Sequence, residues 1–210
     1  MVGLRARNGE KSMEQNIQDN ELLEAQLREC FGRVVYSTKA HEKSADACTS
    51  RLGLIKWGQI LLSAAITGGL LTAVFGDAKV SYVATIASTI ASTILLVINA
   101  YMKDVDPGQQ AEKHKKTASA LWNIRESYLS LLTDLRSGAI ADDEARIKRD
   151  NLQAQLMEIY ASASRTTAVS YLEASVGLKE KEELTFSDDE IDQFLPVALR
   201  LNKKKSGTGI

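Results

Sequence analysis

Proline and histidine are scarce in this 210-residue chain, and each scarcity excludes a class of structure. The two prolines, Pro107 and Pro196, leave long segments free to form helices, and no run outside two apolar segments alternates β-branched with polar residues. The sequence therefore predicts an all-α fold. The two histidines, His41 and His114, have no cysteine or histidine at metal-ligand spacing, so neither predicts a metal site.

Cysteine is equally scarce. Cys30 and Cys48 fall on one predicted helix, about 27 Å apart along its axis, and cannot form a disulfide with each other. They are expected to be reduced thiols in the core or on the surface. The net charge of −1 gives no reason to expect direct nucleic-acid binding. Phosphate-binding loops and nucleophile elbows are also missing from the cytoplasmic part, so neither an enzyme nor a bound cofactor is predicted.

Charged residues make up 25% of the chain but are absent from residues 57–76 and 80–102. As helices, segments of 20 and 23 residues extend about 30 Å, the thickness of a bilayer's hydrocarbon core. Only three residues separate them, so the second helix must return beside the first. The pattern predicts a transmembrane hairpin. A buried hairpin in a soluble protein is the alternative, since both segments carry several serines and threonines, but soluble helices of this length rarely lack charge.

Basic residues flank the outer ends of this hairpin, whereas its turn holds one lysine, Lys79, offset by Asp77. By the positive-inside rule, both termini are expected in the cytoplasm, and only the short turn is expected on the far side of the membrane. Aromatic residues suited to the headgroup level lie near the span ends. The basic residues are Lys39, Lys43, Arg51, Lys56, Lys103, Lys113, Lys115 and Lys116, and the aromatic ones are Trp57, Tyr82 and Tyr101.

The remaining sequence divides around the hairpin into four parts. Residues 1–18 are expected to be a disordered N-terminal extension, in which either Met1 or Met13 is the true start. Residues 19–56 form a cytoplasmic N-terminal helix that continues into the first span. Residues 103–200 form a cytoplasmic helical domain, and residues 201–210 a disordered tail.

Local signals place the helix boundaries of that domain. Pro107 suits the first position of a helix that ends near Gly138. The acidic run that starts at Asp142 favours a second helix, expected to continue to Val176 and to stop at Gly177. A capping box, Ser187 with Glu190, opens a short helix through Phe194, closed by Leu195 and Pro196.

Hydroxyl and amide side chains follow one face of the second span, within about 40° of one line on a helical wheel. The first span carries a shorter polar edge. These faces line a pore, or they pack the hairpin or its oligomer together, and both interpretations stay open. Neither span has an ionisable side chain, which argues against a proton relay, an ion-coupled transporter or a voltage sensor. The residues are Ser81, Thr85, Ser88, Ser92 and Asn99 in the second span, and Gln59, Ser63 and Thr67 in the first.

Apolar residues on the helix after Pro107 form a candidate interface with other subunits or with a partner. They recur on an approximate heptad, as expected for a helix that packs against another. The residues are Leu121, Trp122, Tyr128 and Leu132.

Four sequence segments resemble the SLATT family of small bacterial two-transmembrane proteins from defence and conflict systems. They are YSTKAHEKSAD at residues 36–46, KWGQI at 56–60, TGG at 67–69 and FSDDEIDQFLP at 186–196. The resemblance covers roughly residues 20 to 200. It identifies a family rather than a chemistry, because these segments specify helix packing and helix ends.

This resemblance implies a homo-oligomeric effector that assembles or opens in the inner membrane during infection, so that the leak arrests or kills the cell. It also implies a partner encoded nearby: a nucleotide-messenger synthase, a SLOG protein or a reverse transcriptase. One alternative is a non-conducting membrane anchor whose cytoplasmic helices recruit or restrain a partner enzyme. Another is a holin-like phage protein, against which the long cytoplasmic domain weighs.

Overall fold

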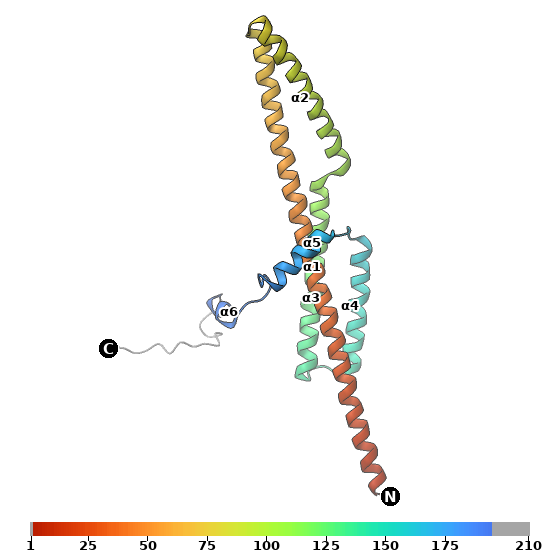
Figure 1. The fold of residues 1–210 in the computed structure, drawn as a ribbon. Coiled ribbons are helices and arrows are strands. Elements are labelled where there is room, and N and C mark those ends of the chain that lie inside the picture. Colours follow the sequence, from red (N-terminus) through yellow and green to blue (C-terminus); the bar gives the residue numbers. More distant parts are fainter. Residues whose placement is uncertain (1, 195–210) are drawn as a thin grey trace, which may run out of the picture.

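The computed structural model describes the backbone of residues 2–194 and the side chains of residues 18–194, apart from Asp188, Asp192 and Phe194. Within this range the chain is helical, without strands (Figure 1). The helices are α1 (Val2–Phe75), α2 (Ala78–Val105), α3 (Pro107–Ser137), α4 (Asp142–Ser162), α5 (Ala168–Lys179) and α6 (Asp188–Phe194).

Helix α1 organises the molecule. Its 74 residues run without a break from the N-terminal end to the tip of the hairpin (Figure 1). Helix α2 lies beside its C-terminal part, and α3 and α4 lie beside its N-terminal part. The disordered extension expected for residues 1–18 differs from the structure, in which α1 begins at Val2. The continuous helix joins the bundle directly to the first span.

Local sequence signals place three of the helix boundaries as predicted. Asp106, in the left-handed conformation, accepts a hydrogen bond from the backbone N–H of Gln109 and separates α2 from α3, and Pro107 begins α3. Gly138, at φ 71°, ends α3. Three acidic residues fill the first turn of α4, beginning with Asp142.

The capping box also forms. The carboxylate of Glu190 accepts hydrogen bonds from the backbone N–H and the hydroxyl of Ser187, at 2.8 and 2.9 Å. It opens the short α6 helix, as predicted. The closing pair Leu195 and Pro196 lies outside the described residues.

The predicted continuous helix from Asp142 to Val176 is wrong. Helix α4 ends at Ser162, and α5 begins at Ala168. The Thr167 hydroxyl accepts a hydrogen bond from the backbone N–H of Ser170 and so caps α5. The predicted stop, Gly177, instead lies inside α5, which continues to Lys179. Serine and threonine favour such breaks because their hydroxyls compete for backbone partners, and the break lets α5 pack across α1.

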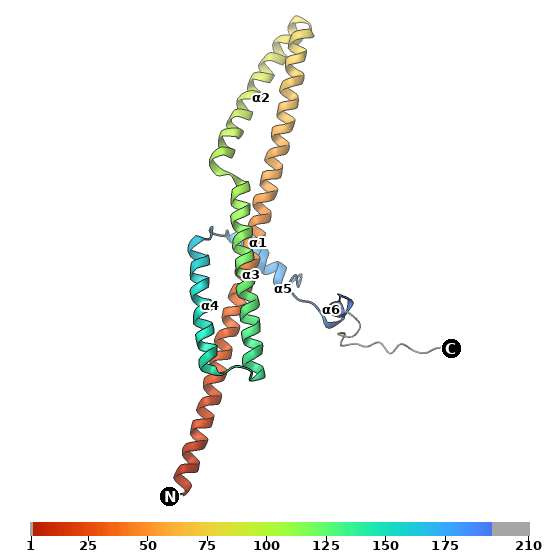
Figure 2. The same cartoon turned by 180° about the vertical axis from the view of Figure 1, so that it is seen from behind.

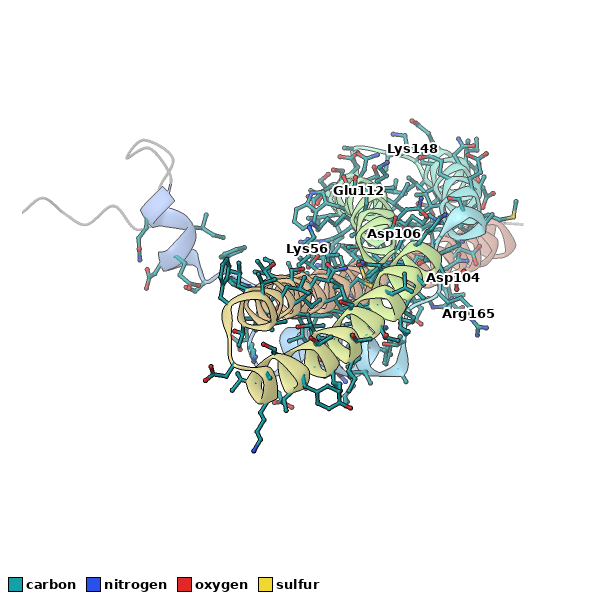
Figure 3. All side chains as sticks on the ribbon, turned by 90° about the horizontal axis from the view of Figure 1, so that it is seen from above. Lys56, Asp104, Asp106, Glu112, Lys148 and Arg165 are labelled. Carbon is teal, nitrogen blue, oxygen red and sulfur yellow. The ribbon has the colours of Figure 1, made fainter. Side chains whose placement is uncertain are left out.

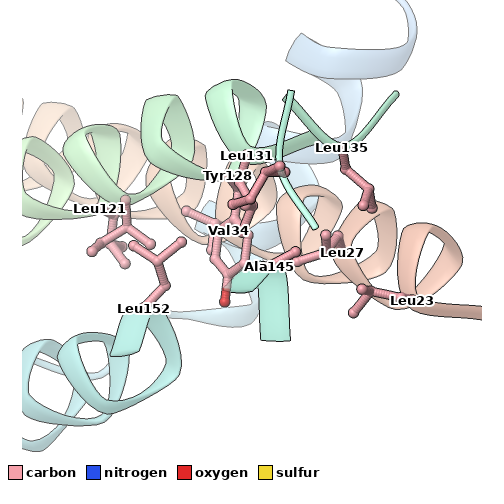
Figure 4. Packing of buried hydrophobic residues seen from close by; sticks show 11 residues of the cluster. Leu23, Leu27, Val34, Leu121, Tyr128, Leu131, Leu135, Ala145 and Leu152 are labelled. Carbon is pink, nitrogen blue, oxygen red and sulfur yellow. The ribbon is translucent and has the colours of Figure 1, made fainter. Parts of the chain in front are cut away.

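A hydrophobic core joins α1, α3 and α4 at the end of the molecule away from the hairpin (Figure 4). Leu27 and Val34 of α1 meet Leu121 and Tyr128 of α3, and Leu152 of α4 closes the third side. Helix α5 crosses α1 on the face away from α3, so α1 lies between them (Figures 1 to 3). The contacts of α1 with α3 and α5 therefore fix the position of the helix that continues into the hairpin.

The two apolar helices are long and apolar enough to cross a membrane. In the most apolar window of each, 0% of the residues of α1 and 6% of those of α2 are buried in the protein. Leu71, Phe75 and Val83 are among the exposed apolar residues. A core hairpin of a soluble protein would bury these side chains, so that alternative does not fit the structure.

Candidate functional site

The hairpin is held together by small residues on the facing sides of α1 and α2. Gly69 and Ala73 of α1, with Ala84, Ser88 and Ala91 of α2, are among the small residues that are partly or fully buried there. Small residues let two backbones approach closely, and in lipid such packing replaces the hydrophobic effect as the source of association.

Gly69 and Ser88 are in tight contact across the hairpin. A Cβ atom at Gly69 would lie 2.1 Å from the Ser88 hydroxyl oxygen, so the contact exists only because residue 69 is glycine. Ser88 is 5% exposed, and its hydroxyl has no hydrogen-bond partner in the described part of the chain. In the single subunit, Ser88 therefore faces the first span and serves helix packing. Ser81, at the hairpin tip, donates to the carbonyl of Gly76.

The hydroxyls of Thr85, Ser63 and Thr67 are exposed, and each donates a hydrogen bond to a backbone carbonyl of its own helix. Thr85 donates to the Ser81 carbonyl at 2.8 Å, Ser63 to Gln59 at 2.8 Å, and Thr67 to Ser63 at 3.0 Å. Each donor is thus satisfied without water, while each hydroxyl oxygen can still accept a hydrogen bond. Ser92 is also exposed.

An amide pair joins the two polar faces at the base of the hairpin. Gln59 Nε2 donates to Asn99 Oδ1 at 2.7 Å. Ser63 and Thr67 follow Gln59 along α1 at four-residue steps, and Ser92 and Thr85 precede Asn99 along α2 at seven-residue steps. The two polar lines therefore begin at this amide pair and continue along the hairpin toward its tip.

The candidate interface on α3 divides into buried and exposed residues. Leu121 and Tyr128 are 0% exposed and belong to the core of the chain itself, so no partner can reach them in this conformation. Leu132 packs partly against the same core. Trp122 is 43% exposed, with the Arg125 guanidinium 4.2 Å above its ring. The heptad pattern predicts packing but not its partner, and here most of that partner is α1.

The two histidines meet where α1 packs on α3. Their Nδ1 atoms lie 2.9 Å apart, and both residues are buried. Burial, with the neighbouring His114 ring, lowers the pKa of His41 to about 4, and burial lowers the pKa of His114. Both rings are therefore neutral at pH 7, when one donates and the other accepts. Sequence reasoning missed this pair because its members are 73 residues apart.

A carboxylate holds the segment after α5 against α1. Glu183 contacts the ammonium groups of Lys39, at 2.7 Å, and Lys43, at 3.2 Å. Burial alone would lower the pKa of Lys39, but hydrogen bonds to Glu183 and Glu42 outweigh it and raise this pKa. Hydrogen bonds from both lysines lower the pKa of Glu183. These contacts were not predicted, since Glu183 is 140 residues from Lys43.

Groups that could hold a metal ion are absent from the described residues.

The hairpin is long enough to cross a bilayer, and one continuous helix joins it to the helical bundle. These two features define a two-pass helical membrane protein. The chain belongs to the SMODS and SLOG-associating 2TM effector domain family 4, which it matches over residues 23–190. This family is an effector domain of defence systems and not a known catalytic fold, and its name implies association with SMODS and SLOG proteins. The comparisons with curated proteins and with solved structures found no match.

Proposed function

We propose that this protein is a homo-oligomeric effector of the bacterial inner membrane, with both termini in the cytoplasm. Several hairpins assemble around an axis and form a pore. The pore depolarises the membrane and so arrests or kills the infected cell. The helical bundle holds the subunits and receives the signal.

The exposed polar side of the hairpin carries this proposal. Ser63 and Thr67 of α1, with Thr85 and Ser92 of α2, present hydroxyls on one flank, and Gln59 and Asn99 add amides at its base. Lipid tails offer no partner to these groups, so this flank favours water or another subunit. A pore of modest selectivity needs only such neutral polar groups.

The continuous α1 helix supplies a path from signal to pore. Its bundle portion contacts α3, α4 and α5, and its last turns form the first span. A change in bundle packing therefore moves the first span as one rigid element. The signal comes from a partner: a nucleotide-messenger synthase, a SLOG protein or a reverse transcriptase encoded nearby.

A non-conducting anchor that recruits or restrains a partner enzyme is the second candidate. The observation that favours it is the exposed surface of α3, where Trp122 and Leu129 are 43% and 44% exposed. If the protein is such an anchor, cell killing should depend on Trp122 but not on the polar residues of the two spans.

The test measures membrane potential with a dye in bacteria that express the protein together with its neighbouring genes. Thr85→Val removes one hydroxyl at constant shape, and Ser92→Leu blocks the polar flank. Both should reduce depolarisation without reducing membrane insertion. Thr72→Val is the matched control, because Thr72 donates to Gly68 in the same way but lies off the polar line. Unchanged depolarisation in both span variants would contradict the pore lining, and loss of killing on Trp122→Ala alone would favour the anchor.

A further inference from the structure

The break between α4 and α5 creates a cleft of about 840 Å³ against α1. Arg33, Tyr36 and His41 line it from α1, and Tyr160, Arg165 and Tyr171 line it from the other side. Volumes of this order are typical of small-molecule sites. A continuous helix from Asp142 to Val176 would not have formed this cleft, so the sequence alone gave no sign of it.

Two guanidinium groups supply positive charge. Arg33 donates through Nε to Glu29 at 3.0 Å, and its terminal nitrogens make no hydrogen bond to other described residues. Arg165 is exposed at the outer edge of the bundle (Figure 3). Glu29 also lines the cleft and offsets one charge. The guanidinium geometry suits a phosphate or a carboxylate.

Tyrosine rings supply a planar apolar surface beside this charge. Tyr36 and Tyr171 stack with their ring centroids 5.8 Å apart. Tyr171 is 57% exposed, so part of its ring remains open to a ligand. Tyr160 donates its hydroxyl to Ser37 at 2.9 Å, which holds a third ring at the cleft. Exposed tyrosine faces bind planar rings by stacking.

His41 and Gly32 complete the α1 wall. His41 is 4% exposed and uses Nδ1 for His114, while its Nε2 has no hydrogen-bond partner within the described residues. A Cβ at Gly32 would meet nothing within 4 Å, so the wall is open beside the helix backbone. This nitrogen is free to form a hydrogen bond with a ligand in the cleft.

We propose that this cleft binds a small organic anion that carries a planar ring. Its anionic group lies against Arg33 and Arg165, and its ring lies against Tyr171. A nucleoside phosphate and an aromatic carboxylate share this chemistry. Such a ligand contacts α1 and the α4–α5 break together. The proposal does not depend on whether the hairpin conducts.

The experiment measures binding to the full-length protein in lipid nanodiscs by isothermal titration calorimetry. The probes are adenosine monophosphate, with inorganic phosphate and adenosine as its separate halves, and indole-3-acetate, with acetate and indole as its halves. One of the ring-bearing anions should bind once per chain, at least about tenfold more tightly than either half, because ring and charge contribute together. The probe that binds more tightly shows whether the ligand is a nucleoside phosphate or an aromatic carboxylate. Binding of neither ring-bearing anion at millimolar concentration overturns the proposal.

Two variants locate the binding in this cleft. Gly32→Phe fills the cleft, and Arg165→Gln removes an exposed charge without disturbing the core; each should weaken binding about tenfold or more. Gly53→Phe is the matched control for the first, since a Cβ at Gly53 also meets nothing within 4 Å. Arg28→Gln is the control for the second, because Arg28 lies on α1 outside the cleft, paired with Glu24. Unchanged affinity in Arg165→Gln and in a folded Gly32→Phe would refute the site.

Discussion

At the residue scale, the buried histidine pair makes the stability of the bundle depend on pH. In the folded chain the pKa of His41 is lowered from 6.5 to about 4, and that of His114 is lowered as well. Between these pH values the unfolded chain binds more protons than the folded chain. The free energy of unfolding therefore falls as pH decreases from 6.5 toward 4. We expect a lower melting temperature at pH 5.5 than at pH 7.5.

The control is the double variant His41→Gln, His114→Gln. It should show a smaller difference in melting temperature between the two pH values, whatever its stability at pH 7.5. Glu183 does not confuse the comparison, because its pKa is lowered from 4.5, so its contribution is lost only at more acidic pH. An equal pH difference in the wild type and the double variant would contradict the prediction.

At the element scale, the packing of α1 on α2 depends on glycine at position 69. A larger side chain there would meet Ser88 and, at 3.5 Å from the Cβ position, the Ala84 carbonyl. We expect Gly69→Leu to destabilise the hairpin by about 1–3 kcal/mol, the cost of overpacking. Reversible unfolding in mixtures of mild detergent and dodecyl sulfate measures this loss.

The neighbouring glycine provides the control for this substitution. A Cβ at Gly68 meets nothing within 4 Å, so Gly68→Leu adds the same side chain to the same helix without a clash. It should be nearly neutral. Equal destabilisation by both variants would mean that the Gly69–Ser88 contact does not determine the packing.

At the scale of the whole molecule, the positive-inside pattern predicts that only the hairpin turn reaches the far side of the membrane. In a variant without Cys30 and Cys48, Asp77→Cys should react with a membrane-impermeant maleimide in spheroplasts, prepared by removing the outer membrane. Glu144→Cys, in the first turn of α4 with its native side chain 61% exposed, should react only after the inner membrane is permeabilised. Labelling of Glu144→Cys in sealed spheroplasts would reverse the proposed orientation.

Much of the helical architecture could be predicted because its signals are local. The charge-free segments predicted the hairpin, Pro107 and Gly138 the ends of α3, and Ser187 the start of α6. Each boundary depends on a few neighbouring residues and their backbone preferences. The break after Ser162 escaped prediction because it contains neither proline nor glycine, and α5 gains its packing from a distant part of α1.

The sequence by itself determined that this chain is helical, has a hairpin long enough for a bilayer and belongs with two-transmembrane effector proteins, since composition and local spacing carry that information. Only the tertiary structure decided which helix faces meet. It placed Ser88 on Gly69, His41 on His114, and Tyr128 inside the subunit. Periodicity shows that a helix has an apolar or small-residue face, but the partner of that face depends on packing between segments far apart in sequence.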